Sequence, residues 1–230
     1  MKGSVSIEWQ GESLDLLPDR AVYWPKEKTL YIADTHFGKA ATFRKVGIPV
    51  SEHTTVEDCQ RLSQLMEETA AEKLIILGDF LHARAGRAQP VRNQLFNWRD
   101  QYNQLSIVLI RGNHDNQSGD PWPELDIECM PDPTKAENWD LRHLPIESFS
   151  KPYMAGHLHP GYRLSGAGRD TLRSPCWIVG ENRLILPAFG GFTGLKNVTL
   201  EPSEKLYLTN GKEIIPISKT VGVPLDSEIY

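Results

Sequence analysis

The sequence predicts an α/β fold in which two β-sheets pack face to face as a β-sandwich flanked by helices. Two observations support this class. In the first half of the chain, apolar runs typical of strands alternate with segments of helical periodicity, whereas after about residue 121 short strand-like pieces are separated by turn residues. A length of 230 residues is enough to bury one sizeable core, so we expect a single domain over residues 1–230.

The first half begins with short apolar segments and continues with alternating strands and helices. Residues 5–9, 14–17, 21–24 and 30–33 are broken by Gly, Pro, Asp and Lys, as consecutive strands would be. The run Thr54-Thr55-Val56-Glu57 fits a capping box, and apolar residues then repeat at helical spacing to about residue 71. Buried strands are expected at 74–77 and 107–110, with an amphipathic helix over 91–102 between them. This alternation implies parallel strands joined by crossover helices.

The second half should be mainly β. Strand-like segments occur at residues 139–144, 153–155, 176–179 and 184–186. The stretch from about 197 to 230 is expected to form a pair of strands or a C-terminal appendage, and its role is left open.

Composition limits the classes of function. Lys and Arg number 25 against 30 Asp and Glu, for a net charge of -5, which argues against a large nonspecific nucleic-acid surface. Bound metal ions would add positive charge that this count omits. Three separated cysteines without a CxxC pair favour a reducing cytoplasm. The sequence shows neither a signal peptide nor an apolar run of membrane-spanning length, so we expect no membrane association.

Four apolar runs end in polar residues that bind metals well. The clusters are Asp34-Thr35-His36, Gly78-Asp79, Gly112-Asn113-His114-Asp115 and Gly156-His157-Leu158-His159. In α/β sheets, ligands bind beyond the carboxyl ends of strands, so these clusters are expected to meet in space. In an extended backbone, residues two apart lie on one face, so Asp34 and His36 should serve one site together, as should His157 and His159.

Taken in this order, the motifs DxH, GD, GNHD and GHxH resemble those of the calcineurin-like metallophosphoesterases. The resemblance implies a metallo-dependent phosphatase-like fold with four layers, αββα, and hydrolysis of phosphoester bonds at two divalent cations. It further implies that Asp34, His36 and His159 hold one cation, that Asn113, His143 and His157 hold the other, and that Asp79 bridges both. His143 has no flanking motif and is chosen as the isolated histidine ending the 139–144 segment; the alternative is His53, at a polar helix start.

The same resemblance suggests the catalytic groups. His114 is the expected histidine that binds no metal and lies close to the leaving group, and Asp115 is included with it as a candidate catalytic residue. Phosphoprotein phosphatases of this superfamily read GDxxD, whereas this sequence has His82 in place of the second Asp, as in DNA-repair nucleases of the SbcD type. The alternative is that His82 is only a packed neighbour of Phe80.

A longer resemblance covers residues from about 32 to 194. It rests on the stretches ADTHFGKAATFRKVGIPV, LGDFLHARAGR, RGNHD, AGHLHP, GRDTLRSPCW and LPAFGGFTG, which are similar to the ligase-associated DNA damage response endonucleases. The similarity implies a nuclease linked to DNA repair, DNA as substrate, and a DNA ligase or helicase as possible partners. Several cations near the motifs could contact DNA phosphates or could be ordinary surface cations: Lys39, Arg44, Arg84, Arg111 and Arg169, together with Arg87 and Arg173.

Two cations about 3.5–4 Å apart could clamp a phosphodiester, activate water and stabilise the entering and leaving oxygens. Ligands of only O and N type suit Mn, Fe, Zn or Ni, and the resemblance favours Mn²⁺. Three functions remain open: a DNA nuclease; a phosphodiesterase or phosphatase acting on nucleotides or other small phosphate esters, which the acidic charge balance favours; and a noncatalytic scaffold that binds a ligase or helicase.

Overall fold

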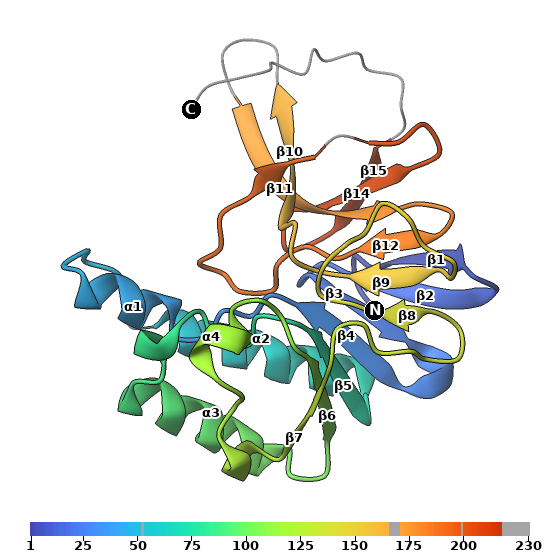
Figure 1. The fold of residues 1–230 in the computed structure, drawn as a ribbon. Coiled ribbons are helices and arrows are strands. Elements are labelled where there is room, and N and C mark those ends of the chain that lie inside the picture. Colours follow the sequence, from blue (N-terminus) through green and yellow to red (C-terminus); the bar gives the residue numbers. More distant parts are fainter. Residues whose placement is uncertain (52, 166–170, 199, 218–230) are drawn as a thin grey trace.

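Two mixed β-sheets stack face to face, and the α-helices lie on the outer side of the first sheet (Figure 1). The computed structural model describes residues 1–51, 53–165, 171–198 and 200–217. The predicted class, a two-sheet sandwich flanked by helices, is confirmed. No helix within the described residues has the length and apolar character needed to cross a membrane.

The first sheet has seven strands in the same order as in the chain. They are β1 (Val5–Trp9), β2 (Glu12–Leu17), β3 (Ala21–Trp24), β4 (Thr29–Ala33), β5 (Lys73–Leu77), β6 (Ser106–Ile110) and β7 (Ile127–Met130). Strands β1 to β4 form an antiparallel meander, and β4 to β7 pair in parallel. Parallel pairing brings the carboxyl ends of β4, β5 and β6 to one edge of the sheet, where three of the four polar motifs follow.

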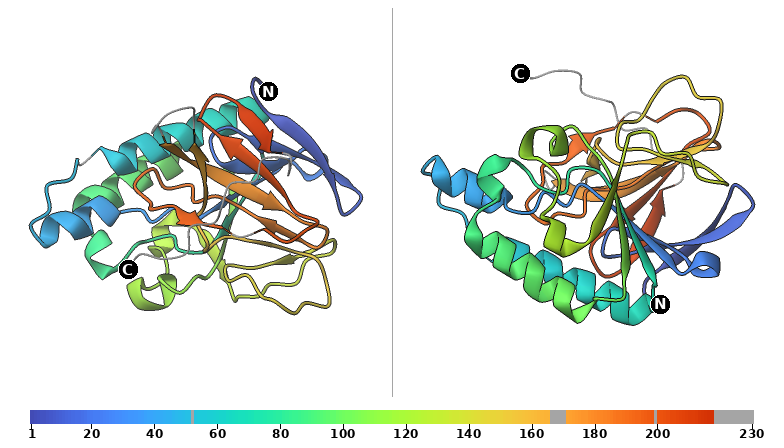
Figure 2. Two further views of the ribbon diagram at one scale, coloured as in Figure 1. Left: turned by 90° about the horizontal axis from the view of Figure 1, so that it is seen from above. Right: turned by 60° about the horizontal axis from the view of Figure 1, so that its bottom comes forward.

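The helices pack by their apolar faces. The α-helices are α1 (Lys39–Lys45), α2 (Thr54–Thr69), α3 (Gln89–Gln101) and α4 (Asp115–Ser118), and short 3-10 helices span Pro25–Glu27, Arg84–Gly86 and Pro123–Leu125. Figure 2 shows α2 and α3 side by side across one face of the first sheet. Their buried Leu62, Leu65 and Leu95 pack against inward-facing strand residues such as Ile32 and Ile76, as the helical period of the sequence requires.

The helix expected from the capping box begins at the predicted residue, but the box itself does not form. His53 occupies the N-cap position of α2, and no side-chain cap hydrogen bond is made there. Thr54 is already the first helical residue, so its hydroxyl lies one position too late to cap the helix.

The second sheet is formed by the later part of the chain. Its strands are β8 (Asp140–Leu141), β9 (Tyr153–Ala155), β10 (Pro160–Ser165), β11 (Thr171–Val179), β12 (Arg183–Ile185), β13 (Lys196–Asn197), β14 (Lys205–Thr209) and β15 (Ile214–Ile217). The order is β13-β10-β11-β12-β9-β8, with β14 pairing with both β11 and β15. The strand expected over 139–144 is reduced to β8, because its pairing with β9 ends at Leu141 and the chain then turns toward the first sheet.

The described helices of the layered fold all precede residue 126, so the second sheet is covered differently from the first. Among the described residues, the outer face of the second sheet is covered by strand and loop side chains rather than by a helix: Ile146, Leu158, Tyr162, Leu164, Val198, Leu200 and Ile217 pack against the buried cluster around Tyr153 and Ile178. The reason lies in the sequence after about residue 121, where turn residues interrupt the chain too often for a long amphipathic helix.

A buried apolar layer joins the two sheets. Ala33, Leu77 and Ile110 of the first sheet pack in one cluster with Trp177 and Leu186 of the second. Beside them the Trp139 ring lies 5.1 Å from Trp9, 4.8 Å from Trp24 and 6.4 Å from Tyr31, measured between ring centroids. The layer fixes the second sheet, and the histidines that follow β8 and β9, against the edge of the first.

Trp177 allows a direct test of this layer, because its side chain is completely buried. Trp177→Ala should lower the free energy of unfolding by about 3–5 kcal/mol, the usual loss when a large buried ring is removed. Trp177→Phe keeps an aromatic ring and should lose much less. Urea unfolding of both variants measures the difference, and a similar loss for the two would show that the ring does not pack as described.

Candidate metal centre

Loops from five strands converge at one edge of the sandwich. Asp34 and His36 follow β4, Asp79 follows β5, Asn113 follows β6, His143 follows β8, and His157 and His159 follow β9. Five of these residues have positive φ, a conformation that side chains with a Cβ rarely adopt and that clusters at functional sites. They are Asp34 (52°), His36 (46°), Asp79 (54°), His157 (68°) and His159 (45°).

The first group of donors consists of Asp34, His36 and His159. The Nε2 atoms of His36 and His159 lie 3.2 Å apart, and His159 Nε2 lies 3.5 Å from Asp34 Oδ1. Donors about 2.1 Å from a common ion lie about 3–3.5 Å from one another, so this spacing fits a metal ion. Asp34 Oδ1 is buried and has no hydrogen-bond partner among the described residues. A cation there would satisfy it.

The second group surrounds His143, which is completely buried. Its Nε2 lies 2.9 Å from Asn113 Oδ1, 3.0 Å from His157 Nδ1 and 3.4 Å from Asp79 Oδ1. His143 Nδ1 donates a hydrogen bond to the carbonyl oxygen of Leu77 at 3.1 Å. This bond places the proton on Nδ1 and leaves the Nε2 lone pair facing the other donors, as in a metal-binding histidine.

Asp79 lies between the two groups. Its Oδ2 is 3.7 Å from His36 Nε2, whereas its Oδ1 is 3.4 Å from His143 Nε2. Each carboxylate oxygen thus faces a different group. The alternative histidine, His53, is exposed at the start of α2 and belongs to neither group.

Two glycines allow the loops to approach one another this closely. A Cβ on Gly78, which has a φ of 81°, would lie 2.0 Å from His143 Nδ1, and one on Gly112 would lie 2.2 Å from Asp79 Oδ1. Any side chain at either position would push a donor away from the centre.

Asp115 holds the loops after β5 and β6 together. Its buried carboxylate accepts hydrogen bonds from the backbone N–H groups of Asp79 (2.8 Å), Phe80 (2.9 Å) and Gly112 (2.8 Å). Burial raises the pKa of Asp115 to about 6, although these hydrogen bonds act in the opposite direction. Both oxygens are occupied by backbone groups, so the geometry favours a positioning role over the catalytic role expected from the sequence.

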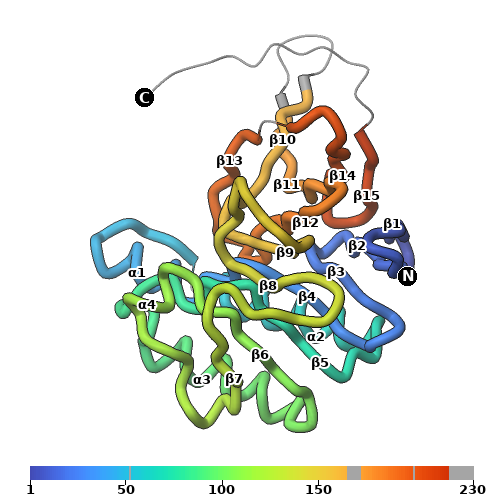
Figure 3. The backbone as a smooth tube through the Cα atoms, turned by 45° about the vertical axis from the view of Figure 1, so that its right-hand side comes forward, coloured from blue at the N-terminus to red at the C-terminus, as the bar shows by residue number. Residues whose placement is uncertain are grey.

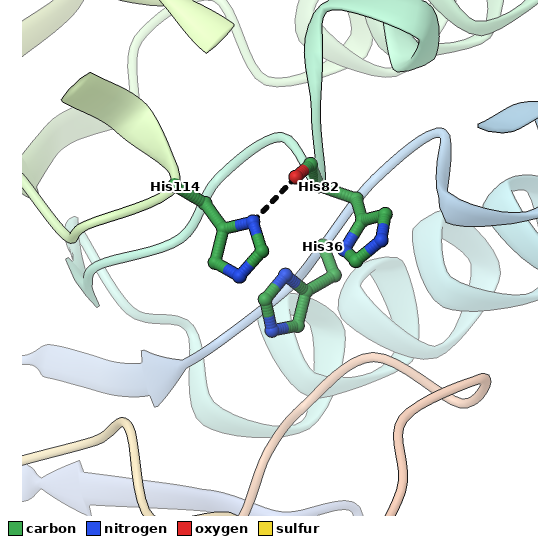
Figure 4. Close-up of side chains that lie close together, drawn as sticks. All are labelled: His36, His82 and His114. Atoms are coloured by element: carbon green, nitrogen blue, oxygen red, sulfur yellow. Dashed lines mark hydrogen bonds between the residues drawn. The ribbon is translucent and has the colours of Figure 1, made fainter. Parts of the chain in front are cut away.

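His36, His82 and His114 lie close together beside the first group (Figure 4). His114 Nδ1 donates to the carbonyl oxygen of His82 at 2.5 Å, and its Nε2 lies 3.9 Å from Asp79 Oδ2. The rings of His82 and His114 stack with centroids 5.0 Å apart. The His114 ring is therefore held by the backbone of residue 82, not by the side chain at that position.

His82 is partly buried, which bears on its protonation. Burial, together with the nearby Lys39 ammonium and His114, lowers the pKa of His82 to about 4. Its imidazole is therefore neutral at neutral pH in the free protein.

A loop from the second sheet closes the site from the other side. The backbone N–H of Phe189 donates to Ala33 O at 2.7 Å. Asp58 of α2 accepts from the Gly191 N–H at 3.0 Å, and Arg61 donates to the Phe189 carbonyl while its guanidinium lies 4.2 Å from the centre of the Phe189 ring. Sequence reasoning missed Asp58 and Arg61. These two residues could have been found in the sequence as a pair of opposite charges, three residues apart, on the side of the helix otherwise expected to be apolar.

The cations expected to bind substrate have different environments. Lys39, at the start of α1, is half-buried near His36 and His82, and burial lowers its pKa. Arg111 instead forms a two-pronged ion pair with Asp120 at 2.7 and 2.8 Å. The remaining expected cations bind backbone carbonyls or lie outside the described residues: Arg84 donates to Gln117 O, Arg87 to Asp120 O, Arg44 to Val50 O and Arg173 to Leu195 O, and Arg169 is not described.

Clusters of Asp and His that could hold metal lie at the carboxyl ends of strands in a two-sheet α/β sandwich, an arrangement suited to a metal-dependent hydrolase. Residues 27–208 match the model of the calcineurin-like phosphoesterase family, and the chain belongs to this family. It is a hydrolase acting on phosphoester bonds, a class that uses divalent metals. The resemblance noted in the sequence is thus confirmed.

Solved structures add a closer similarity. The Pseudomonas putida nuclease MPE is 41% identical, with a TM-score of 0.82 over 93% of this chain and 100% of that one. The Escherichia coli phosphoesterase Yfce is 14% identical, with a TM-score of 0.39 over 81% of this chain and 96% of that one. No curated protein matches the sequence.

The position of Asp79 between the donor groups leads to a test. The purified protein should bind two divalent ions per chain, and Asp79→Asn should weaken both sites by at least about tenfold to 100-fold, because the carboxylate serves each group. After dialysis at a defined concentration of free Mn²⁺, metal analysis measures the number of ions bound per chain. Asp120→Asn removes a carboxylate outside both groups and should retain both ions; loss of only one ion from Asp79→Asn would contradict the bridging position.

Proposed function

We propose that the protein is a DNA nuclease that hydrolyses phosphodiester bonds at a dinuclear metal centre, with Mn²⁺ as the metal. The observation that carries the proposal is the Asp79 carboxylate, whose oxygens face separate groups of donors. The similarity to a nuclease over nearly the whole chain supports a nucleic acid as the substrate, and the sequence resemblance favours DNA.

The donor set suggests how the ions would be held. Asp34, His36 and His159 with Asp79 would hold one, and Asn113, His143 and His157 with Asp79 the other. When bound, the ions would polarise the phosphate and supply an activated water. The set has no thiolate, so it is compatible with Mn²⁺.

His114 is suited to protonate the leaving oxygen. Its Nδ1 is occupied by the His82 carbonyl, which fixes the ring and leaves Nε2 directed toward Asp79 and the donor groups. A proton on Nε2 can then be given to the departing ester oxygen as the bond breaks. Lys39, beside the same histidines, would contribute a positive charge near the phosphate.

His82 supports a diester rather than a monoester as substrate. A carboxylate at position 82 would repel the neighbouring phosphates of a nucleotide chain, whereas a neutral imidazole does not.

A small-phosphate substrate is the second candidate, favoured by the net charge of -5. A DNA ligase or helicase as partner, a link to DNA repair and a cytoplasmic location are proposed on the sequence resemblance. The cysteines at 59, 129 and 176 are free, as a reducing compartment would keep them.

The substrate class can be tested with a panel containing added Mn²⁺: a nitrophenyl diester, the matching monoester, cyclic nucleotides, and linear and circular DNA. We expect faster cleavage of the diester than of the monoester, cleavage of DNA, and a shift toward the monoester in His82→Asp. Activity on DNA should fall steeply with salt, because phosphate contacts release counterions. Monoester cleavage equal to or faster than diester cleavage would favour the small-phosphate function.

The role of His114 can be tested with leaving groups of different quality. His114→Gln should lose about 10²–10⁴-fold on DNA, whose alkoxide leaving group needs a proton, and much less on a nitrophenyl diester. Metal content should remain near that of the unaltered protein. Equal losses on both substrates, or a loss of metal, would show that His114 positions the site, and His82→Gln would then be tested as the acid.

A further inference from the structure

We propose that the β10–β11 hairpin carries a second phosphate-binding site, formed by Arg163 and Arg173, that holds the backbone of the substrate strand away from the scissile bond. The inference rests on the proposed function, because it concerns a long phosphodiester substrate. Neither residue belongs to the donor groups of the metal centre.

The two arginines are directly opposite one another. Strands β10 and β11 pair antiparallel with Arg163 in register with Arg173, so their side chains leave the same face of the hairpin. Like charges directly opposite one another destabilise a sheet. A pair that lowers stability is more readily explained by an anion that binds between the side chains.

Within the described residues, no acidic side chain lies on the strands that carry this pair or on the neighbouring strand β13. Arg173 donates to Leu195 O at 2.6 Å and to Asn197 Oδ1 at 3.0 Å, both uncharged. Arg163 is exposed and has no polar partner among the described residues. The planar donors of a guanidinium group match the oxygens of a phosphate.

Arg173 is also held in place, which reduces the entropy lost on binding. Its contacts with Leu195 and Asn197 reach across β10 to the segment that contains β13. Gly161 leaves the space for that segment, because a Cβ there would lie 2.6 Å from the Leu195 Cβ. One guanidinium is fixed and its neighbour is free to turn toward a ligand.

The hairpin starts at the metal centre. Pro160, the first residue of β10, follows His159 directly, and Lys196 N–H donates to His159 O at 3.0 Å. Figure 3 traces β10 away from this point and β11 back toward it. Four residues of extended strand separate His159 from Arg163 by about 13 Å. With about 3.4 Å of axial rise per nucleotide in duplex DNA, this corresponds to roughly four nucleotides.

This distance gives a test based on substrate length. With Mn²⁺, kcat/KM of the unaltered protein should rise as DNA oligonucleotides become longer than about four nucleotides. Arg163→Gln should lose roughly 3- to 10-fold on long oligonucleotides, the net worth of one typical hydrogen bond in a solvent-exposed place. The variant should keep full activity on a nitrophenyl diester. The slope of the logarithm of the DNA-binding constant against the logarithm of the salt concentration should become smaller in magnitude by about 0.7–0.9.

Lys205→Gln is the matched control. Lys205 is exposed on β14 of the same sheet and pairs with Val179, at the other end of β11 from Arg173. The Lys205→Gln variant removes one positive charge and should leave the dependence of kcat/KM on oligonucleotide length unchanged. Thermal unfolding provides a second measurement: Arg163→Gln should be as stable as the unaltered protein or more so, since it relieves repulsion.

Three results would overturn the inference. The first is that kcat/KM depends on oligonucleotide length in the same way in Arg163→Gln and in the unaltered protein. The second is that Lys205→Gln loses as much kcat/KM on long oligonucleotides as Arg163→Gln does. The third is that Arg163→Gln loses so much thermal stability that its activity on the nitrophenyl diester falls as well. A failure of the unaltered protein to cleave any DNA would overturn the proposed function and this inference with it, whereas the three results above leave the proposed function standing.

Discussion

The organisation of the site depends on the loop that carries Asp79. Its backbone carbonyl accepts a hydrogen bond from the His36 N–H at 2.8 Å, and its backbone N–H donates to Asp115. Its Oδ1 accepts from the His114 N–H at 2.9 Å. One residue thus connects the loops after β4, β5 and β6, so a displacement of this loop would move both groups of donors and the histidine beside them.

This arrangement places many carboxylate oxygens and imidazole nitrogens together, with few N–H or O–H groups nearby to donate hydrogen bonds to them. Burial is the largest cause that lowers the pKa of His36 and His157 and raises that of Asp79, so the site is a poor environment for isolated charges. Cations can satisfy the carboxylates and the imidazole lone pairs at the same time. Metal binding at these groups would therefore be coupled to folding, because ions that bind only the folded chain stabilise it.

Much of this structure could be predicted from local sequence. The apolar runs of β4, β5 and β6 and the helical periods of α2 and α3 depend on neighbouring residues, and the polar motifs follow directly from the strand ends. The resemblance required one further histidine, and His143 was chosen for it as the isolated histidine ending the 139–144 segment; the structure places it beside the other donors. The short β8 and the contact of His143 with Leu77 depend on contacts between distant parts of the chain. Local patterns do not specify those contacts.

The left-handed backbone at several donor positions affects how substitutions there should be interpreted. Asp, Asn and His are among the residues that tolerate this conformation best apart from glycine, so the types that bind cations are also the types that the backbone accepts. Replacing Asp34 by alanine removes an oxygen donor and also a residue suited to its φ of 52°. An alanine scan of this edge would therefore combine two effects, whereas an Asp-to-Asn exchange changes the donor and keeps the backbone preference. The same reasoning applies to transplanting the centre: the loop conformations would have to be copied together with the side chains.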